Sequence, residues 1–245
     1  MGWQEFDFDA DNYEAWYASP EGGRADRAEQ ALVDWLLQHI PDAVSALEVG
    51  CGTGHFTVVF ASRGLFAVGL DRAPAMIDGF RRMHPELPAI LGDAHELPFR
   101  DGAVDVTAFV ASLEFMTHPE AALAEAVRVS RKGLILVVLN KWSVGGLSRR
   151  WGSQSQGRRL GRARDFSLAQ LRKLVRVAAS DRPHKLKWMS ALYPVGSAAR
   201  LTRAPLGDVN GMVVTFGSSS LREDQQDWAH TYRAGRLFSP GPWLA

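Results

Sequence analysis

The sequence predicts an α/β fold, in which a mostly parallel sheet carries helices on both faces. Two observations lead to this prediction. Short apolar runs alternate with segments of helical periodicity from Val44 to Leu139, which is typical of strands joined by crossover helices. A glycine-rich turn at residues 50–54 follows the first apolar run. Such a turn is typical of the connection between a parallel strand and the helix that follows it. The 245 residues are enough for one such domain with a full core.

We expect seven strands from the apolar runs. They span residues 44–49, 67–70, 89–91, 104–110, 133–139, 185–191 and 212–216. The dipeptide Asn210-Gly211 is a common turn signal, so we place a turn directly before the last strand.

Helical periodicity alternates with these strands. We expect helices at residues 54–62, 74–83, 119–130 and 167–178, the last with Ser167 as its N-cap. Ahead of the first strand, residues 26–39 place their apolar side chains on one stripe, which predicts an amphipathic helix.

The composition argues against several classes of protein. With 46% hydrophobic and 22% charged residues, the chain is typical of globular proteins, and a net charge of +1 gives no reason to expect polyanion binding. The single cysteine, Cys51, excludes an intramolecular disulfide. The acidic, aromatic N-terminus lacks the pattern of a signal peptide, and the longest apolar run, residues 134–139, is too short for a membrane span. We therefore expect a cytoplasmic protein.

We expect three regions along the chain. Residues 1–40 form an N-terminal helical lid or cap segment, residues 41–220 form the main domain, and residues 221–245 form a C-terminal tail. Residues 141–165 are an arginine-rich insertion in the main domain. Its arginines are Arg149, Arg150, Arg158, Arg159, Arg162 and Arg164. They suit either a contact with an anionic group over the site or a solvated loop with one short helix, and we favour the loop.

The glycine loop lies in the stretch ALEVGCGTGHFTVVF, residues 46–60. Gly50, Gly52 and Gly54 leave out the Cβ atoms that would keep a ligand away from the backbone at the start of a helix. A dinucleotide-binding loop of the G-x-G-x-x-G type would need glycine at position 55, where His55 stands.

An acid follows the second predicted strand. Asp71 stands where a carboxylate accepts both hydroxyls of a ribose. A basic side chain near the loop would stabilise a bound phosphate. There is no lysine or arginine between Glu48 and Phe60, and His55 is mostly neutral at pH 7. The sequence therefore predicts a ligand that contains a ribose and no phosphate.

Four motifs in order resemble the class I S-adenosylmethionine-dependent methyltransferases. They are EVGCGTG, GLDRAPAMI, GDAHELPFRDGAVDV and AVRVSRKGLILVV. The resemblance covers residues 47–139 and is closest to the ubiquinone/menaquinone-biosynthesis-like small-molecule branch. It implies a Rossmann-like, seven-stranded, mostly parallel sheet with an antiparallel last strand. It also implies S-adenosyl-L-methionine as cofactor, S-adenosyl-L-homocysteine as product, and a small-molecule methyl acceptor.

The resemblance also implies roles for the first two motifs. The methionine half of the cofactor would lie against Glu48 and the loop residues Gly50, Cys51, Gly52 and Gly54. Asp71 would hold the ribose hydroxyls. Each acid has a structural alternative, since Glu48 also suits an exposed strand end and Asp71 a cap for the helix at Pro74.

The resemblance also implies which residues of the later motifs contact the adenine and the methyl group. Arg72 and Met76 would flank the adenine, Asp93 would accept a hydrogen bond from its amino group, and Ala94 would contact the ring through its backbone. Residues 111–114, beginning with Ala111, would lie under the transferable methyl. Asp93 alternatively suits a turn after Gly92.

No obligatory catalytic side chain follows from this resemblance, because positioning and desolvation supply much of the catalysis of methyl transfer. The candidates for a base are Glu114, His118 and Tyr13. Many relatives have histidine directly after the glutamate, where Phe115 stands here. We expect no metal ligands.

Aromatic side chains in the N-terminal segment resemble the opening of one bacterial and archaeal subgroup. Tyr13, Trp16 and Tyr17 suit either a lid over the cofactor or the packing of a helix against the sheet.

Other functions remain open. A protein that binds S-adenosylmethionine without methyl transfer fits the same residues, and His55 argues against a nucleotide-dependent oxidoreductase. The near-neutral charge, and Ala111-Ser112-Leu113-Glu114 in place of an asparagine-proline-proline-aromatic motif, argue against a nucleic-acid substrate. The oligomeric state is left open.

Overall fold

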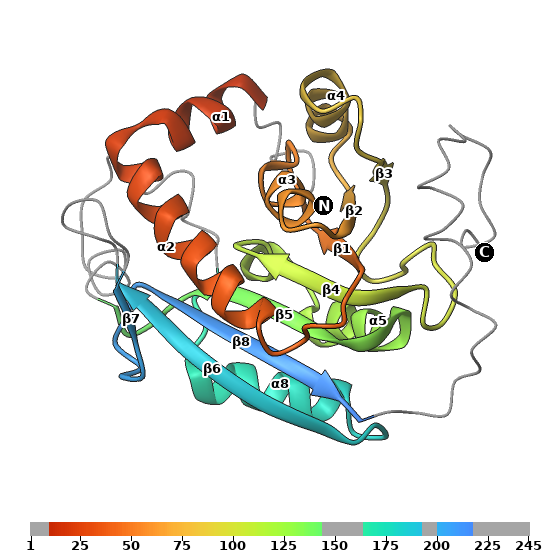
Figure 1. The fold of residues 1–245 in the computed structure, drawn as a ribbon, viewed down its shortest axis with the longest axis vertical. Helices are drawn as coiled ribbons and strands as arrows, with labels where there is room; N and C mark the ends of the chain where they lie inside the picture. Colours follow the sequence, from red (N-terminus) through yellow and green to blue (C-terminus); the bar gives the residue numbers. More distant parts are fainter. Residues whose placement is uncertain (1–9, 144–163, 193–199, 218–245) are drawn as a thin grey trace.

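The computed structural model describes residues 10–143, 164–192 and 200–217. Within these ranges it contains one eight-stranded sheet (Figure 1). The strands are β1 (Ser45–Val49), β2 (Phe66–Asp71), β3 (Ala89–Leu91), β4 (Val104–Val110), β5 (Ser130–Leu139), β6 (His184–Leu192), β7 (Arg200–Thr202) and β8 (Val209–Phe216). Every expected strand is present, and the bounds of β3 and β4 are those expected from the sequence.

The strands are ordered β3-β2-β1-β4-β5-β8-β6-β7. The first five pair in parallel, whereas β8 pairs antiparallel with both β5 and β6. The mostly parallel sheet with an antiparallel last strand is therefore confirmed. The expected count of seven is one too low because β7, a three-residue edge strand on β6, is too short and too exposed to give an apolar run.

The turn expected at Asn210-Gly211 is wrong. Both residues lie inside β8, where Asn210 pairs with Val138 and Ser190, and Gly211 pairs with Val137 and Met189. A Cβ at Gly211 would lie 3.1 Å from side-chain atoms of Leu32 and Leu36. Glycine is present here because a helix packs directly on the strand, and no turn is formed.

Helices cover both faces of the sheet (Figure 1). They are α1 (Ala10–Ala18), α2 (Pro20–Leu37), α3 (His55–Ser62), α4 (Pro74–Met83), α5 (Pro119–Val129) and α8 (Leu168–Ala178), with a 3-10 turn η1 (Leu113–Phe115) after β4. Ser167 caps α8 as expected, through a capping box with Gln170. The helix expected at residues 26–39 begins earlier, at Pro20, because Ser19 caps it.

Two apolar clusters fill the two faces of the sheet. One lies under α5 and α8 and includes Leu123, Leu136 and Leu171. The other lies under α2 and α3 and includes Leu32, Phe60 and Val137. Adjacent residues of β5 enter opposite clusters because strand side chains alternate between faces. None of the helices in the described ranges is long and apolar enough to cross a membrane.

The strand order reverses between β1 and β4, so the connections that leave these neighbouring strands run to opposite sides. In open α/β sheets this switch point opens a crevice at the carboxyl ends of the strands, where ligands bind. The glycine loop follows β1 and η1 follows β4. The fold therefore brings the predicted loop and the predicted methyl-transfer segment to one edge.

Candidate functional site

The loop after β1 has a left-handed backbone at each of its three glycines, with φ of 75° at Gly50, 54° at Gly52 and 93° at Gly54. A Cβ at Gly50 would lie 2.6 Å from the Cβ of Ser112, and one at Gly54 would lie 2.8 Å from the Phe80 ring. L side chains rarely adopt such φ values and have no space here. The loop is a backbone cradle that ends at the start of α3.

Asp71 is tied to this cradle. Its Oδ2 accepts a hydrogen bond from the Gly52 N–H at 2.9 Å, and its Oδ1 accepts one from the Ala73 N–H at 2.9 Å. Burial raises the pKa of the carboxyl, and these backbone hydrogen bonds only partly oppose the rise. The bond to Ala73 fits the helix-cap alternative and the bond to Gly52 couples Asp71 to the loop. Each oxygen keeps a lone pair for a ligand hydroxyl.

Glu48 is buried, with a relative exposure of 3%, so the exposed strand-end alternative is wrong. Its Oε2 accepts a hydrogen bond from the Thr57 hydroxyl. Its pKa is raised to about 8, chiefly by burial and also by the nearby Asp71, and the hydrogen bond from Thr57 opposes the rise only in part. A positively charged ligand group beside Glu48 would favour the ionised carboxylate.

The predicted adenine residues lie at the adjacent strand end, where the Gly92 N–H donates to the Asp71 carbonyl at 2.9 Å. Asp93 forms a turn, since its Oδ1 accepts from the His95 N–H at 3.0 Å and lies 2.5 Å from His95 Nδ1. Desolvation raises the pKa of Asp93, but these bonds outweigh it and the pKa is lowered. Ala94 and Met76 are buried and Arg72 is exposed.

The loop cysteine is buried under the cradle. Cys51 is 3% exposed and packs with Ile77 and Phe80 of α4. Burial raises the pKa of its thiol well above the usual value. A thiol held in the neutral form is a poor nucleophile, so Cys51 contributes shape and backbone to the loop.

Contacts that the sequence did not reveal join the N-terminal helices to the loop. Glu14 of α1 accepts a hydrogen bond from the Thr53 hydroxyl. The Tyr17 ring stacks on His55, with centroids 3.9 Å apart. Asp26 of α2 lies 2.8 Å from His55 Nε2. The segment therefore lies against the start of α3, and Tyr13 belongs to α1, although its side chain is outside the described residues.

The segment after β4 begins with a strained residue. Ala111 has φ of 48°, an unfavourable value for a residue with a Cβ. Ser112 then donates to the Val49 carbonyl at 2.7 Å, which fixes η1 beside the cradle. Strained backbone that surrounding structure holds in place is common at functional sites. The geometry thus brings Ala111 and the following residues to the loop.

The two base candidates of this segment lie in different environments. Glu114 is 1% exposed, and its Oε1 accepts a hydrogen bond from the Leu139 N–H at 2.6 Å, at the end of β5. The His118 side chain is 68% exposed, and its Nδ1 lies 3.5 Å from Glu120 Oε1. Only Glu114 is enclosed at the carboxyl edge of the sheet.

Sequence reasoning missed Glu29. This residue of α2 is 3% exposed and lies on the face that packs against the sheet. Its position was detectable, because Glu29 falls one turn ahead of Leu32 and Val33 on the apolar stripe of the helix. An acidic residue on a buried stripe is a departure from amphipathic patterning and indicates a functional group. The arginine-rich insertion, except Arg164, lies outside the described residues.

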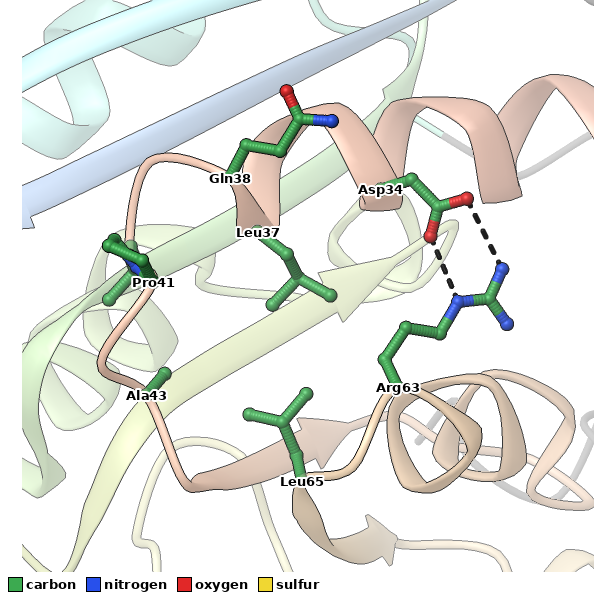
Figure 2. A pocket seen from close by; sticks show the side chains of 8 residues that line it. Asp34, Leu37, Gln38, Pro41, Ala43, Arg63 and Leu65 are labelled. Atoms are coloured by element: carbon green, nitrogen blue, oxygen red, sulfur yellow. Dashed lines mark hydrogen bonds and ion pairs between the residues drawn. The ribbon is translucent and has the colours of Figure 1, made fainter.

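A pocket elsewhere carries none of the predicted site residues. Its lining residues are Asp34, Leu37, Gln38, Ile40, Pro41, Ala43, Arg63 and Leu65 (Figure 2). Arg63 and Asp34 form an ion pair at 2.9 Å across one side of it. Ala43 and Leu65 precede β1 and β2, so this pocket lies at the amino ends of the strands, opposite the cradle.

Residues 47–138 match the family model described as a methyltransferase domain. This part of the chain is a methyltransferase domain. Its parallel sheet, glycine loop and motif order agree with the resemblance to the class I S-adenosylmethionine-dependent methyltransferases. The match covers β1 to β5, the elements that carry the cradle, Asp71 and η1.

Curated relatives match the methyltransferase domain over part of their length. An uncharacterized methyltransferase of Mycobacterium tuberculosis is 38% identical over 113 residues, which cover 46% of this chain and 45% of that protein. A demethylmenaquinone methyltransferase of Renibacterium salmoninarum is 37% identical over 105 residues, which cover 40% of this chain and 44% of that protein. The chain thus spans less than half the length of these relatives.

A solved structure from Thermotoga maritima extends the similarity of fold beyond the methyltransferase domain. That protein is described as an S-adenosylmethionine-dependent methyltransferase and possible histamine N-methyltransferase. It has a TM-score of 0.70 and 24% identity, with 87% of this chain and 98% of that chain covered. At this identity the likeness shows the fold alone.

The donor set of the cradle fits S-adenosylmethionine chemically. That cofactor carries a ribose and positive charge and has no phosphate. The cradle offers a backbone surface without Cβ atoms at its glycines, the Asp71 carboxylate and the buried Glu48 carboxyl. Carboxylates suit both ribose hydroxyls and cationic groups, so the residues present match the cofactor that the family uses.

Proposed function

We propose that the chain transfers a methyl group from S-adenosylmethionine to a small-molecule acceptor. The observation that carries this proposal is the position of Asp71, which is hydrogen-bonded to the Gly52 N–H at the carboxyl edge of the sheet. A carboxylate held at that point accepts ribose hydroxyls beside a loop that a ligand can approach closely. The methyltransferase domain supplies every element of this arrangement.

We assign the remaining residues by their place around the cradle. Glu48 and the backbone of Gly50, Cys51, Gly52 and Gly54 hold the methionine half. Asp71 holds the ribose. On the adenine side, the contacts come from Arg72, Met76, Asp93 and Ala94. Ala111 begins the segment under the methyl group.

The cofactor, when bound, supplies a methyl group on a sulfonium centre. The chain's own residues position and enclose the reactants. The ordered cradle lowers the entropy cost of alignment, and the N-terminal contacts of Glu14 and Tyr17 with the loop region help to exclude water. We expect an acceptor smaller than a nucleic acid because the net charge is only +1.

Two carboxylates disfavour the alternative of a dinucleotide cofactor. A pyrophosphate would lie at the amino end of α3. There, Asp26 lies 2.8 Å from His55 Nε2, and Glu14 bonds Thr53. These negative charges would repel a phosphate, whereas they suit a cationic ligand.

Isothermal titration tests the proposal directly. We expect S-adenosylmethionine and S-adenosylhomocysteine to bind the full chain and NAD not to bind. Asp71→Asn should weaken both adenosyl ligands about 10- to 100-fold, because it removes a charged acceptor worth about 1.5–3 kcal/mol per hydrogen bond. Asp78→Asn is the matched control, since Asp78 lies on the exposed side of α4.

The possible results separate the three functions. Binding of NAD in place of the adenosyl ligands would contradict the proposal. Tight binding of S-adenosylmethionine followed by a gain of one methyl mass on an acceptor supports transfer. Binding with no such product across a broad acceptor library would support the alternative of a binding protein.

A further inference from the structure

Glu29 is a buried carboxyl that the proposed cofactor site does not use. It is 3% exposed, and its Oε2 has no hydrogen-bond partner. No lysine or arginine within the described ranges forms an ion pair with it. Burial of such a group without a partner costs several kcal/mol and persists in proteins chiefly where a ligand or proton uses it.

Glu29 lies at the same edge of the sheet as the cradle. Helix α2 crosses β5, β8 and β6 (Figure 1), and Glu29 belongs to the face that the helix buries. The negative charge of Glu114 acts on Glu29 and raises its pKa. The Oε1 of Glu114 accepts a hydrogen bond from the Leu139 N–H at the carboxyl end of β5. Asp26, one turn ahead of Glu29 on α2, lies 2.8 Å from His55 Nε2 at the start of α3, where the cradle ends. Glu29 therefore lies on the part of α2 next to the cradle, where the methyl group is transferred in our proposal.

The charges around Glu29 are negative. Burial, together with the carboxylates of Glu114 on η1 and Asp26 on α2, raises its pKa to about 8. The cationic form of His55 on α3, when present, is paired with Asp26. The negative charge of Glu114 therefore adds to the effect of burial and favours the protonated form of Glu29 in the absence of a cation.

This environment discriminates between acceptors. A phenolate or carboxylate acceptor would meet like charge and be repelled. An ammonium group would be attracted, and it would satisfy the free Glu29 oxygen with an N–H bond. An ammonium must also lose a proton before its nitrogen has a lone pair to react, and a carboxyl whose proton affinity is raised by burial suits that task.

We propose that Glu29 and Glu114 form the acceptor subsite and that the acceptor is a basic amine whose ammonium form binds there. This inference rests on the proposed methyl transfer and names its substrate class. Binding of the ammonium favours the ionised form of Glu29, which first releases its own proton to solvent. One N–H bond of the ammonium then breaks, the proton moves to the carboxylate oxygen Oε2 of Glu29, and the electron pair stays on nitrogen. The neutral nitrogen is then available for methylation, and Glu29 returns its proton to solvent.

The first measurement is ¹³C NMR of glutamate side-chain carboxyls in the full chain loaded with S-adenosylhomocysteine. We expect one carboxyl with a pKa near 8, that of Glu29, because the ammonium group of the bound ligand should lower the pKa of Glu48. Glu29→Gln should remove this titration, and an added amine should lower the pKa that it reports. Glu21→Gln is the matched control, because Glu21 is on the same helix and its side chain is 58% exposed.

The second measurement is calorimetric binding to the same samples, with 2-phenylethylamine against 2-phenylethanol and hexylamine against hexanol. We expect the amines to bind the wild-type protein and Glu21→Gln at least about tenfold more tightly than the alcohols. Glu29→Gln should lose that preference while its affinity for the alcohols stays the same. The glutamine is isosteric with a protonated carboxyl, so the variant should fold.

Two results would overturn the inference: amines and alcohols that bind alike, or an amine preference that survives in Glu29→Gln. The affinity for S-adenosylhomocysteine, measured on each sample, keeps the two proposals apart. If that ligand binds and no amine preference exists, only the acceptor assignment fails. If that ligand does not bind, the proposed function itself fails.

Discussion

The free energy of unfolding is expected to fall as the pH rises from about 4.5 to about 8, and Glu29→Gln should remove a large part of that fall. The pKa of Glu29 rises from 4.5 to about 8 on folding, chiefly by burial and also through Glu114 and Asp26. Between these pH values the folded state binds more protons than the unfolded state, so stability decreases with pH. Below pH 4.5 Glu29 is protonated in both states and has no effect.

The expected size follows from the shift. At about 1.4 kcal/mol per pKa unit, Glu29 costs on the order of 5 kcal/mol above pH 8. Glu48 has a similar shift, so the wild-type protein should lose stability from both carboxyls. Urea unfolding at pH 4.5, 6, 7 and 8.5 measures the dependence. Glu29→Gln should match the wild-type protein at pH 4.5 and exceed its stability at pH 8.5.

Glu21→Gln serves as the control for the loss of one carboxyl from α2. Its side chain is exposed, so its stability curve should run parallel to that of the wild-type protein. If the curve of Glu29→Gln also ran parallel to the wild-type curve, the carboxyl would ionise in the folded state as it does in water. That result would contradict the burial argument.

Gly54→Ala is expected to destabilise the protein and to abolish tight binding of S-adenosylmethionine. The φ of Gly54 is 93°, and an added Cβ would lie 2.8 Å from the Phe80 ring. The left-handed backbone costs an alanine about 1–2 kcal/mol, and overpacking against a buried ring adds about 1–3 kcal/mol. The loop can relieve the clash only by moving, which displaces the N–H groups of the cradle.

Gly64→Ala separates the two costs. Gly64 has a similar φ of 85°, but nothing lies within 4 Å of its added Cβ. This variant should lose only about 1–2 kcal/mol and bind the cofactor normally. Equal losses for the two variants would show that the Phe80 contact does not constrain the loop. A double-mutant cycle with Phe80→Leu should give a coupling of about 1 kcal/mol or more between positions 54 and 80.

Local chemistry made much of the fold predictable. The apolar runs of β3 and β4 and the helix that begins at Pro74 have the bounds expected from the sequence. Ser167 supplies the predicted cap. Apolar runs, prolines and capping residues affect only the few residues next to them. Their positions in the sequence are therefore enough to predict where these helices and strands begin and end. The glycine loop was predictable for the same reason, since only glycine suits repeated positive φ.

Longer-range contacts explain the errors. The Asn210-Gly211 pair has the composition of a turn, yet β5 and β6 enclose it and α2 packs on Gly211. Likewise, β7 forms only because an edge of β6 is available for pairing. A short stretch of sequence around Asn210 or around β7 does not include these partner strands and helix. Contacts in the folded structure therefore override the local preference.

The candidate site likewise has one part that the sequence predicts and another that only the folded structure produces. The residue types and order of the glycine loop and Asp71 are enough by themselves to predict a ligand that contains a ribose and no phosphate. The environment of Glu29 is different, because it depends on helix α2 burying this carboxyl against the sheet, within the influence of the charges of Glu114 and Asp26. Proton affinity is set by burial and by charges that are close in space. Only folding brings those charges together, so the acceptor subsite that we propose was decided by the tertiary structure.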